Sequence, residues 1–294
     1  MTITASVNSS IRRVVVALLI TASAIACGGT ATTPTTVLTA PTTIAPSSVA
    51  PTPTAASTTL APPTVQSLRV DVIERRPHDR GSFTQGLVMA GGRLYEGSGL
   101  RGESTLREVD ARTGVVARSI SIDNKYFGEG IAVVDDRIIQ LTWQEHTALV
   151  YRLSDFQQVA TFSYDTEGWG LCDDGTRLVM SDGTNQLYFR SRTTFAVQGK
   201  VAVTKNGAPV DQLNELECVD GHVYANVWQT DTIVRVDPAT GRVTAEIDAS
   251  GLLSAADAPG ADVLNGIAYD PATKTFLLTG KLWPALFEVR FVPR

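Results

Sequence analysis

The 294-residue chain carries 25 basic and 30 acidic side chains, which gives a formal net charge of −5 without any basic cluster. This balance excludes nucleic-acid binding, which needs Lys and Arg concentrated on one surface. The three histidines lie far apart, and the sequence has no GxSxG, phosphate-loop or dinucleotide fingerprint. We therefore expect no zinc site, no serine hydrolase of that type and no nucleotide enzyme.

Residues 1–26 have the pattern of an export signal. Two adjacent arginines give a basic start, residues 14–20 form an apolar run too short to span a bilayer, and small residues lead to Cys27. Cys27 with the two glycines after it resembles a bacterial lipobox, with Ala24 in the place where leucine is usual. We expect export and lipid anchoring of Cys27 on the outer face of the cell membrane; the alternative is simple cleavage and secretion.

Residues 27–65 form the next segment, which after its cysteine is almost entirely Thr, Pro, Ala, Ser and Val and has no charged or aromatic residue. Such a composition cannot bury enough apolar surface to offset the entropy of ordering the chain. The pattern predicts a disordered linker that joins the membrane anchor to a globular domain at residues 66–294. The lipid anchor would be the only membrane contact.

A repeated pattern runs through the globular domain: a tight entry, a short apolar run, a β-turn and a second apolar run. Its five copies begin at Gly86, Gly130, Gly170, Glu215 and Gly266. A second hairpin with alternating apolar and polar residues follows each copy, although the fifth hairpin is incomplete. Two hairpins supply four strands, so the pattern predicts an all-β, five-bladed β-propeller with four-stranded blades. Two stacked sandwiches are the alternative.

The strand-like residues 67–75 precede the first repeat and have no hairpin partner, while residues 286–292 form the last strand of the incomplete fifth repeat. Pairing of this N-terminal strand with the C-terminal blade would remove an open sheet edge and close the propeller. Cys172 and Cys218 lie in strand-like runs, where they form either a disulfide or two buried thiols.

Polar or aromatic residues precede the five repeat starts, where the innermost strands of a propeller meet at one channel mouth. These residues are Gln85, Glu129, Trp169, Asn214 and Asn265. A packed core would be apolar at all five positions. The ends of the inner strands contribute further candidates to the same mouth: Glu96, Trp143, Asp182, Trp228, Lys281 and Trp283. Clustered aromatics beside isolated charges favour a small pocket that stacks a flat polar group and binds a charged one, with core packing as the alternative for any single tryptophan.

Nine ordered motifs cover most of the domain: FTQGL, YFGEGI, QLTW, EGWGL, MSDG, LNELE, YANVWQTD, VLNGIAYD and TGKLWP. In these motifs, from residue 83 to residue 292, the chain resembles the plant and bacterial type of glutamine cyclotransferase. The resemblance implies a five-bladed propeller and an enzyme that closes the N-terminal glutamine of a peptide to pyroglutamate with release of ammonia. It implies no required cofactor and no metal; a structural calcium ion stays open.

The resemblance also implies roles. Glu96, in a YE-x-x-G motif, matches the family's proposed catalytic acid and is expected to move the proton. Lys281 is expected either to polarise the amide oxygen or to pair with a carboxylate. The expected substrate-binding residues are Gln85, Glu129, Trp143, Trp169, Asp182, Asn214, Glu215, Asn226, Trp228, Asn265 and Lys281. Because Glu215 and Glu217 alternate in one strand, we expect only one of them to face the channel.

The expected partners are peptides or proteins with a free N-terminal glutamine, and we expect a monomer. Two other functions remain open at this stage. One is a propeller that only binds an extracytoplasmic ligand. The other is a metal-dependent lactonase, for which Asn214, Asn265 and Glu129 could supply ligands at the channel centre.

Overall fold

The computed structural model describes residues 64–294, and all regular structure in that range is β. The expected signal sequence, the lipidated Cys27 and nearly all of the linker lie outside the described residues. No helix in this part of the chain could cross a bilayer.

Three antiparallel sheets of four strands follow one another along the chain. The first contains β2 (Thr84–Ala90), β3 (Arg93–Ser98), β4 (Thr105–Val109) and β5 (Val116–Ser121). The second contains β6 (Gly128–Val134), β7 (Arg137–Thr142), β8 (Thr147–Arg152) and β9 (Gln158–Ser163). The third contains β10 (Leu171–Asp173), β11 (Leu178–Ser181), β12 (Gln186–Arg190) and β13 (Val197–Ala202).

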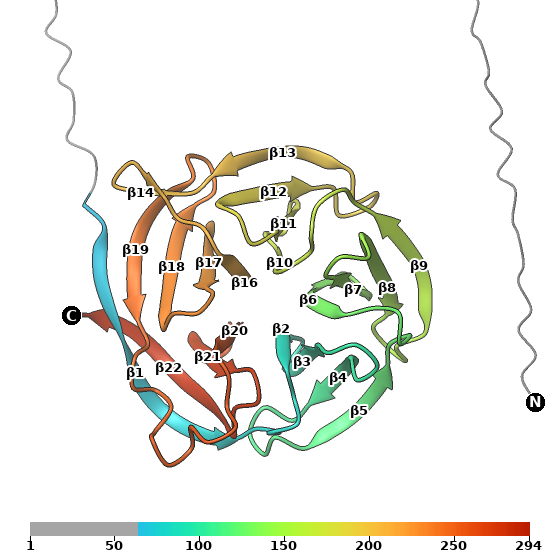
Figure 1. Cartoon of the computed structure of the whole chain (residues 1–294), viewed down its shortest axis with the longest axis horizontal. Helices are drawn as coiled ribbons and strands as arrows, with labels where there is room; N and C mark the ends of the chain where they lie inside the picture. Colours follow the sequence, from blue (N-terminus) through green and yellow to red (C-terminus); the bar gives the residue numbers. More distant parts are fainter. Residues whose placement is uncertain (1–63) are drawn as a thin grey trace, which may run out of the picture. The chain divides into compact units, whose positions relative to one another are not determined.

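The remaining strands form one ten-stranded sheet with a main path of eight strands. In spatial order these are β16 (Leu213–Val219), β17 (His222–Val227), β18 (Thr232–Asp237), β19 (Arg242–Asp248), β1 (Gln66–Pro77), β22 (Ala285–Pro293), β21 (Thr275–Gly280) and β20 (Leu264–Asp270). Two short strands, β14 (Thr204–Lys205) and β15 (Ala208–Pro209), lie off this path. In Figure 1 all the sheets stand around a common centre, with β2, β6, β10, β16 and β20 innermost.

The N-terminal strand joins the two ends of the ring. β1 pairs antiparallel with β22, as the unpartnered strand in the sequence indicated. It also pairs parallel with β19, from Gln66 opposite Ala245 to Arg69 opposite Asp248. This second pairing was not expected, and it merges two four-strand groups into one continuous sheet.

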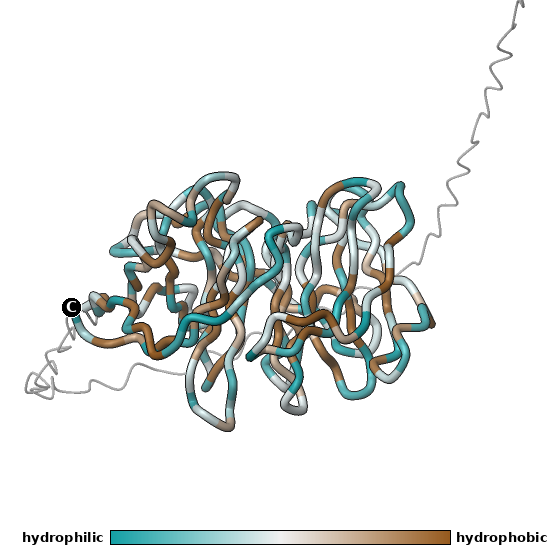
Figure 2. Tube along the Cα trace, turned by 90° about the horizontal axis from the view of Figure 1, so that it is seen from below, coloured by the Kyte–Doolittle hydropathy of each residue, from teal (hydrophilic) through white to brown (hydrophobic). Residues whose placement is uncertain are grey.

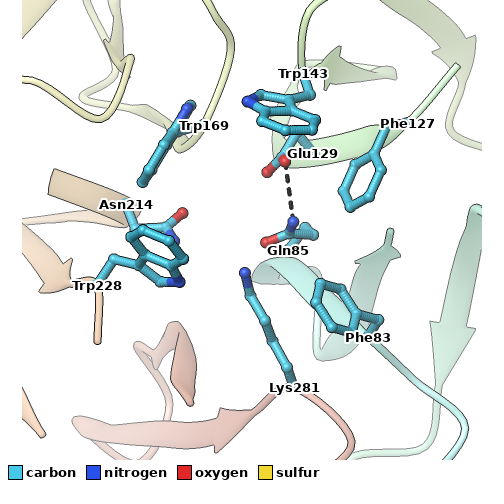
Figure 3. Close-up of a pocket in the computed structure, with 9 residues that line it drawn as sticks. All are labelled: Phe83, Gln85, Phe127, Glu129, Trp143, Trp169, Asn214, Trp228 and Lys281. Atoms are coloured by element: carbon cyan, nitrogen blue, oxygen red, sulfur yellow. Dashed lines mark hydrogen bonds between the residues drawn. The ribbon is translucent and has the colours of Figure 1, made fainter. Parts of the chain in front are cut away.

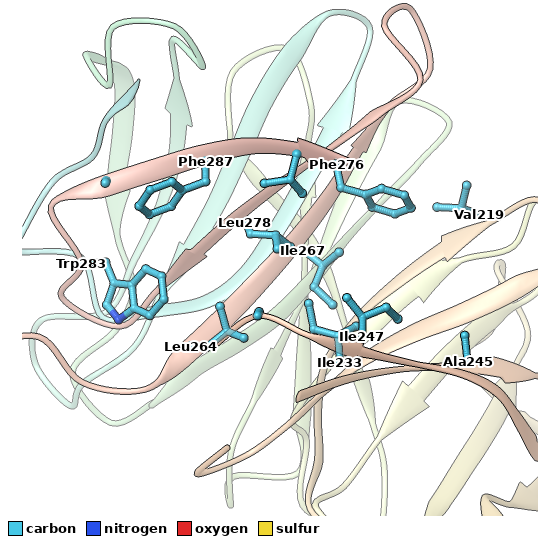
Figure 4. Close-up of a cluster of buried hydrophobic side chains, with 13 residues drawn as sticks. Val219, Ile233, Ala245, Ile247, Leu264, Ile267, Phe276, Leu278, Trp283 and Phe287 are labelled. Carbon is cyan, nitrogen blue, oxygen red and sulfur yellow. The ribbon is translucent and has the colours of Figure 1, made fainter. Parts of the chain in front are cut away.

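The hydrophobic core lies between neighbouring sheets. Figure 4 shows one such cluster, in which Ile233 and Ile247 meet Ile267 and Leu278 from the adjoining strands. All four side chains are fully buried. In the perpendicular view of Figure 2, hydrophobic stretches run along the strands and many loops are hydrophilic. Because successive side chains of a strand point to opposite faces of its sheet, alternate residues enter the hydrophobic core between neighbouring sheets.

Glycine allows the inner strands to approach one another at the centre. A β-carbon on Gly130 would lie 2.6 Å from the carbonyl oxygen of Trp169, and one on Gly170 would lie 2.1 Å from that of Asn214. Both distances are far inside van der Waals contact, so no larger residue fits without moving a strand. Close backbone contact thus explains the glycines that open the first three repeats, Gly86, Gly130 and Gly170.

Cys172 of β10 and Cys218 of β16 form a disulfide, with their Cα atoms 5.5 Å apart. Of the two alternatives that the sequence left open, the structure has the bridge rather than two buried thiols. The bond connects the inner strands of adjacent four-strand groups.

Candidate active site

A pocket of about 230 Å³ lies where the starts of the inner strands meet (Figure 3). The side chains that line it are Phe83, Gln85, Phe127, Glu129, Trp143, Trp169, Asn214, Trp228 and Lys281. Seven of these nine were expected from the sequence to bind substrate. The repeat positions therefore converge on one site, although they are up to two hundred residues apart in the chain.

Irregular pairing aims the polar side chains into the pocket. The hairpin register shifts in β2, β6, β16 and β20, at the segments that contain Gln85, Glu129, Asn214 and Asn265. A β-bulge leaves a residue outside the ladder and changes the direction of its side chain. The same four positions that break the apolar repeat in the sequence thus break the strand geometry as well.

Glu129 is the carboxylate of the pocket, and it is only 5% exposed. Gln85 donates a hydrogen bond to it from Nε2 at 2.9 Å, and the other atom of that amide, Oε1, accepts from Asn265 Nδ2 at 3.3 Å. These two contacts fix the orientation of the Gln85 amide. Burial raises the pKa of Glu129 well above its ordinary value, against the opposing charge of Lys281.

Lys281 enters the same space from the other side, with Gln85 between it and Glu129 in Figure 3. Its side chain is buried, and its Nζ lies 4.8 Å from the centre of the Phe83 ring. No carboxylate in residues 64–294 lies within 4.0 Å of this ammonium. Burial lowers the pKa of Lys281, while Glu129 and Asp262 raise it. The pocket therefore holds a carboxyl group and an amine that burial drives toward their neutral forms.

The aromatic walls are locked by a side chain outside the expected set, Glu167. Its Oε2 accepts the indole N–H of Trp143 at 2.7 Å and that of Trp169 at 3.0 Å. Trp169 meets Trp228 edge to face at 5.6 Å, and Phe127 meets Trp143 at 5.6 Å. The walls are thus a connected set of rings rather than independent side chains.

A sequence model described as glutamine cyclotransferase matches residues 43–291. The chain belongs to the glutamine cyclotransferase family. It is 42% identical over 227 residues to the glutaminyl-peptide cyclotransferase of Arabidopsis thaliana, covering 75% of this chain and 71% of that protein. The crystal structure of Myxococcus xanthus glutaminyl cyclase superposes with a TM-score of 0.73 at 38% identity, covering 78% of this chain and 99% of that one.

Glu96, which the family resemblance predicted to transfer the proton, does not line the pocket. It lies on β3, is 1% exposed, and accepts hydrogen bonds from His78, Ser82 and Thr84. Asp182 is also outside the pocket: its Oδ1 accepts the N–H and hydroxyl of Thr184 in the turn after β11.

Trp283, which the sequence placed at the channel mouth, is instead a core residue. It is 3% exposed, meets Phe287 edge to face, and donates its indole N–H to the carbonyl of Asp262 at 2.7 Å. Of the four tryptophans in the chain, this is therefore the one for which the core-packing alternative applies.

Below the pocket, the remaining expected residues bind backbone groups along the channel axis. Glu215 accepts the N–H of Leu87 at 3.1 Å and that of Ile267 at 2.8 Å. Asn226 accepts the N–H of Gly266 at 3.0 Å. These contacts satisfy donors on the inner edges of β2 and β20, which face the channel rather than a neighbouring strand.

The expectation that only one of Glu215 and Glu217 faces the channel was wrong. Glu217 accepts the N–H of Tyr269 at 3.1 Å, so it reaches the same strand, β20, as Glu215. The reason is elementary: residues two apart in a strand point to the same face. Burial raises the pKa of Glu217 to about 8.

Phe83 and Phe127 were missed, although the sequence contains a signal for them. Each stands two residues before a pocket residue, Gln85 and Glu129, in the motifs FTQGL and YFGEGI. Side chains at that spacing share a face when the strand is regular. Their polarity does not distinguish them, because an isolated phenylalanine in a strand is usually a core residue.

Within residues 64–294, no group of three or more His, Cys, Asp or Glu side chains is arranged to hold a metal ion. Asn265, one of the ligands imagined for a lactonase, uses its amide to bind the carbonyl of Thr84 and the side chain of Gln85. The side chains of Asp173 and Asp174, at the turn between β10 and β11, accept hydrogen bonds from backbone N–H groups and from arginine side chains.

Proposed function

We propose that this pocket cyclises the N-terminal glutamine of peptides to pyroglutamate, with Glu129 as the group that transfers the proton. The proposed cyclisation is the activity for which the two relatives, a glutaminyl-peptide cyclotransferase and a glutaminyl cyclase, are named. The single observation that supports the residue assignment is the buried, hydrogen-bonded Glu129 in an aromatic-walled pocket that Lys281 also lines.

The reaction balances within the pocket. The α-amine nitrogen attacks the γ-carboxamide carbon, a C–N bond forms, and the bond to the amide nitrogen breaks. The ionised carboxylate of Glu129 takes a proton from the attacking nitrogen and returns it to the leaving nitrogen, which departs as ammonia. A carboxyl whose pKa is raised by burial suits both halves of this exchange.

The other lining residues would bind and orient the substrate. Lys281 would donate a hydrogen bond to the amide oxygen as negative charge develops there. Asn214 Oδ1 is buried and has no hydrogen-bond partner among the described residues, so it can accept an N–H of the substrate. The two reacting groups belong to one residue, so the walls need only hold the side chain folded back on its own amine.

The proton-transfer role thus moves from Glu96 to Glu129. Glu96 is outside the pocket lining and its Oε1 already accepts three hydrogen bonds, whereas Glu129 lines the pocket in which the glutamine would bind. Both residues are glutamates within strand-forming motifs, so their polarity alone did not separate them.

Ammonia release from a glutaminyl dipeptide tests the function. Wild-type protein should release ammonia at the same rate with and without a chelator, because the proposed scheme uses side chains only. Glu129→Gln should lower kcat by about 10²–10⁴-fold. Unchanged turnover in this variant would remove Glu129 from the scheme; chelator-sensitive turnover would contradict metal independence. Absence of ammonia would leave a propeller that only binds its ligand.

The blade count is part of the same proposal. The eight-strand path divides at the β1–β19 pairing into β16–β19 and a group of β20, β21, β22 and β1. With the three separate sheets, this division gives five blades of four strands.

We further propose an exported, lipid-anchored monomer. The disulfide between Cys172 and Cys218 supports an oxidising compartment, because such bonds are rare in the cytosol. Metabolic labelling with a fatty-acid analogue should mark the chain and should fail with Cys27→Ala; labelling that survives this change would contradict the anchor. Gel filtration of the soluble domain should give the monomer mass.

A further inference from the structure

A buried ion pair lies behind the pocket wall. The Oε1 atom of Glu96 accepts hydrogen bonds from His78 Nε2 at 3.0 Å, the Ser82 hydroxyl at 2.6 Å and the Thr84 hydroxyl at 2.8 Å. The side chains of His78 and Glu96 are only 3% and 2% exposed. Burial alone would raise the pKa of Glu96, but His78 and the two hydroxyls outweigh it and lower the pKa to about 2.

The hydrogen bonds of His78 define its charge. Its Nδ1 lies 2.8 Å from the carbonyl oxygen of Trp283, and a carbonyl oxygen can only accept. Its Nε2 faces a carboxylate, which also only accepts. Both ring nitrogens therefore carry protons, and His78 is an imidazolium. Burial opposes this charge, yet the carboxylate of Glu96 keeps the pKa of His78 above its ordinary value.

The same imidazolium binds the turn that carries Lys281. Besides the contact to Trp283, the backbone N–H of His78 donates to the carbonyl of Pro284 at 3.0 Å, and the N–H of Leu282 donates to the carbonyl of Ser82 at 2.7 Å. Leu282 has a φ of 59°, in the left-handed region. A leucine adopts this conformation only when its surroundings impose it.

The pair also holds the neighbouring segment of the pocket wall. Thr84, which donates to Glu96, offers its backbone carbonyl to Asn265 Nδ2 at 3.0 Å. Thr84 stands between Phe83 and Gln85, which both line the pocket. One buried ion pair thus contacts the two segments that bring Lys281 and Gln85 to the pocket.

We propose that Glu96 and His78 are positioning residues that clamp the turn at residues 280–284 and thereby fix the ammonium of Lys281 in the pocket. The inference rests on the proposed function, in which Lys281 binds the amide oxygen. It assigns Glu96 an indirect role in the reaction, through Lys281, without contact with substrate.

The first test is kinetic. Glu96→Gln keeps the shape but removes the charge that holds His78 protonated, so kcat/KM should fall by about 10- to 100-fold, as for a misplacement near 1 Å. The loss should grow as pH rises through about 6.5, the ordinary pKa of histidine, because the uncharged ring can no longer donate from both nitrogens. A loss that is equal at all pH values would overturn the clamp.

Glu108→Gln is the matched control. Glu108 is also buried, at 7% exposed, and lies on β4 of the same sheet, where it binds Arg93 and Arg118; none of these three residues lines the pocket. Its loss should lower stability and leave kcat/KM and the pH profile unchanged. A matching kinetic loss in this control would show that Glu96 acts only through stability, and would overturn the proposal.

A double-mutant cycle tests the path through Lys281. In a Lys281→Met background the ammonium is absent, so Glu96→Gln should cost at least three-fold less in kcat/KM than it does in the wild type. An equal loss in both backgrounds would overturn the assignment.

NMR of the histidine ring nitrogens separates the clamp from the reaction itself. With only three histidines in the chain, His78 can be assigned by substitution. At pH 7 its ring should be protonated to a clearly greater extent in the wild type than in Glu96→Gln. A neutral His78 in the wild type would overturn the ion pair. A protonated His78 in a protein that releases no ammonia would instead overturn the proposed function while leaving the clamp in place.

Discussion

Single side chains in this protein do different work depending on which neighbour they reach. Glu129, Glu167 and Glu96 are all carboxylates close to the pocket, yet one lines it, one binds its walls and one is paired behind it. Both Glu129 and Glu96 are buried, so it is their partners that separate their acidity: burial raises the pKa of Glu129, whereas His78 and two hydroxyl donors outweigh burial and lower the pKa of Glu96 to about 2. Only the first is suited to exchanging a proton near neutral pH.

Glu167 should control substrate affinity more than turnover. Glu167→Ala leaves two indole N–H groups without their acceptor, so Trp143 and Trp169 lose their fixed orientation. We expect KM to rise about ten-fold, the equivalent of about 1.4 kcal/mol, with a smaller change in kcat. Gln144→Ala, which removes a donor to Glu167 but keeps its carboxylate, is the control. An unchanged KM in Glu167→Ala would refute this role.

The His78–Glu96 pair also predicts a pH window for stability. The lowered pKa of Glu96 contributes stability that is complete above its unfolded value of about 4.5 and is lost as pH falls toward about 2. The raised pKa of His78 contributes stability that is complete below 6.5 and is lost as pH rises through its folded value. The difference in unfolding midpoint between wild type and Glu96→Gln should therefore be largest between about pH 4.5 and 6.5. A constant difference across pH 3–9 would contradict the pairing.

At this scale the sequence predicted much of the pocket. Gln85, Glu129 and Asn214 were found because a polar residue at a repeat position that is elsewhere apolar is conspicuous. The role of Glu96 could not be found in the same way, because its partner His78 lies outside the repeats. Polarity marks a residue as special without stating whether it faces a ligand or a buried counter-ion.

Among the strands, the four inner ones with register shifts, β2, β6, β16 and β20, have the most direct effect on the geometry of the pocket. Their glycines permit the close approach, and their register shifts direct the polar side chains. The repeat pattern predicted the strands and their hairpins, since alternation and turn residues are local signals. It did not predict the bulges, which depend on how neighbouring strands crowd at the centre.

Gly130→Ala should disrupt both packing and catalysis. The new methyl group would meet the carbonyl of Trp169 at 2.6 Å, so β6 or β10 must shift. We expect a loss of about 1–3 kcal/mol in unfolding free energy and a reduced kcat, because Glu129 is the adjacent residue. Gly199→Ala is the control: its methyl group would lie 3.7 Å from Phe189, an ordinary contact. Equal effects in the two variants would refute the crowding argument.

The disulfide should stabilise the link between β10 and β16. It closes a loop with a sequence separation of 46 residues, for which chain entropy predicts about 4 kcal/mol. Cys172→Ser with Cys218→Ser should lower the unfolding free energy by up to that amount, measured in denaturant without reductant. Wild-type protein in reductant should behave like the variant; unchanged stability in both would contradict a bridged native state.

For the whole molecule, closure depends on β1. This strand pairs with β22 on one side and with β19 on the other. Deletion of residues 28–77 should therefore abolish cooperative unfolding, whereas deletion of residues 28–63 alone should leave the unfolding midpoint of the domain unchanged. Identical thermal transitions in the two truncated proteins would show that the ring closes without β1.

The pairing of β1 with β22 was predicted from the unpartnered strand at the start of the domain and the incomplete repeat at its end. The parallel pairing of β1 with β19 was not, because nothing in the residues of β1 distinguishes one neighbour from two. Sheet edges seek partners in general, and the particular partner is set by the geometry of the assembled ring.

The position of β1 also orders events during synthesis. β1 is made before every other described strand, yet both of its partners come from the last third of the chain, so its native contacts have very high sequence separation. Contacts of that kind form late and slowly. Until β22 has been synthesised, β1 and β21 each lack the strand that lies between them in the folded protein. Lys281 is then not yet held in the pocket with Glu129. Nascent or prematurely stopped chains should consequently be both inert and prone to aggregate, and a chaperone that shields β1 would serve the final, closed enzyme.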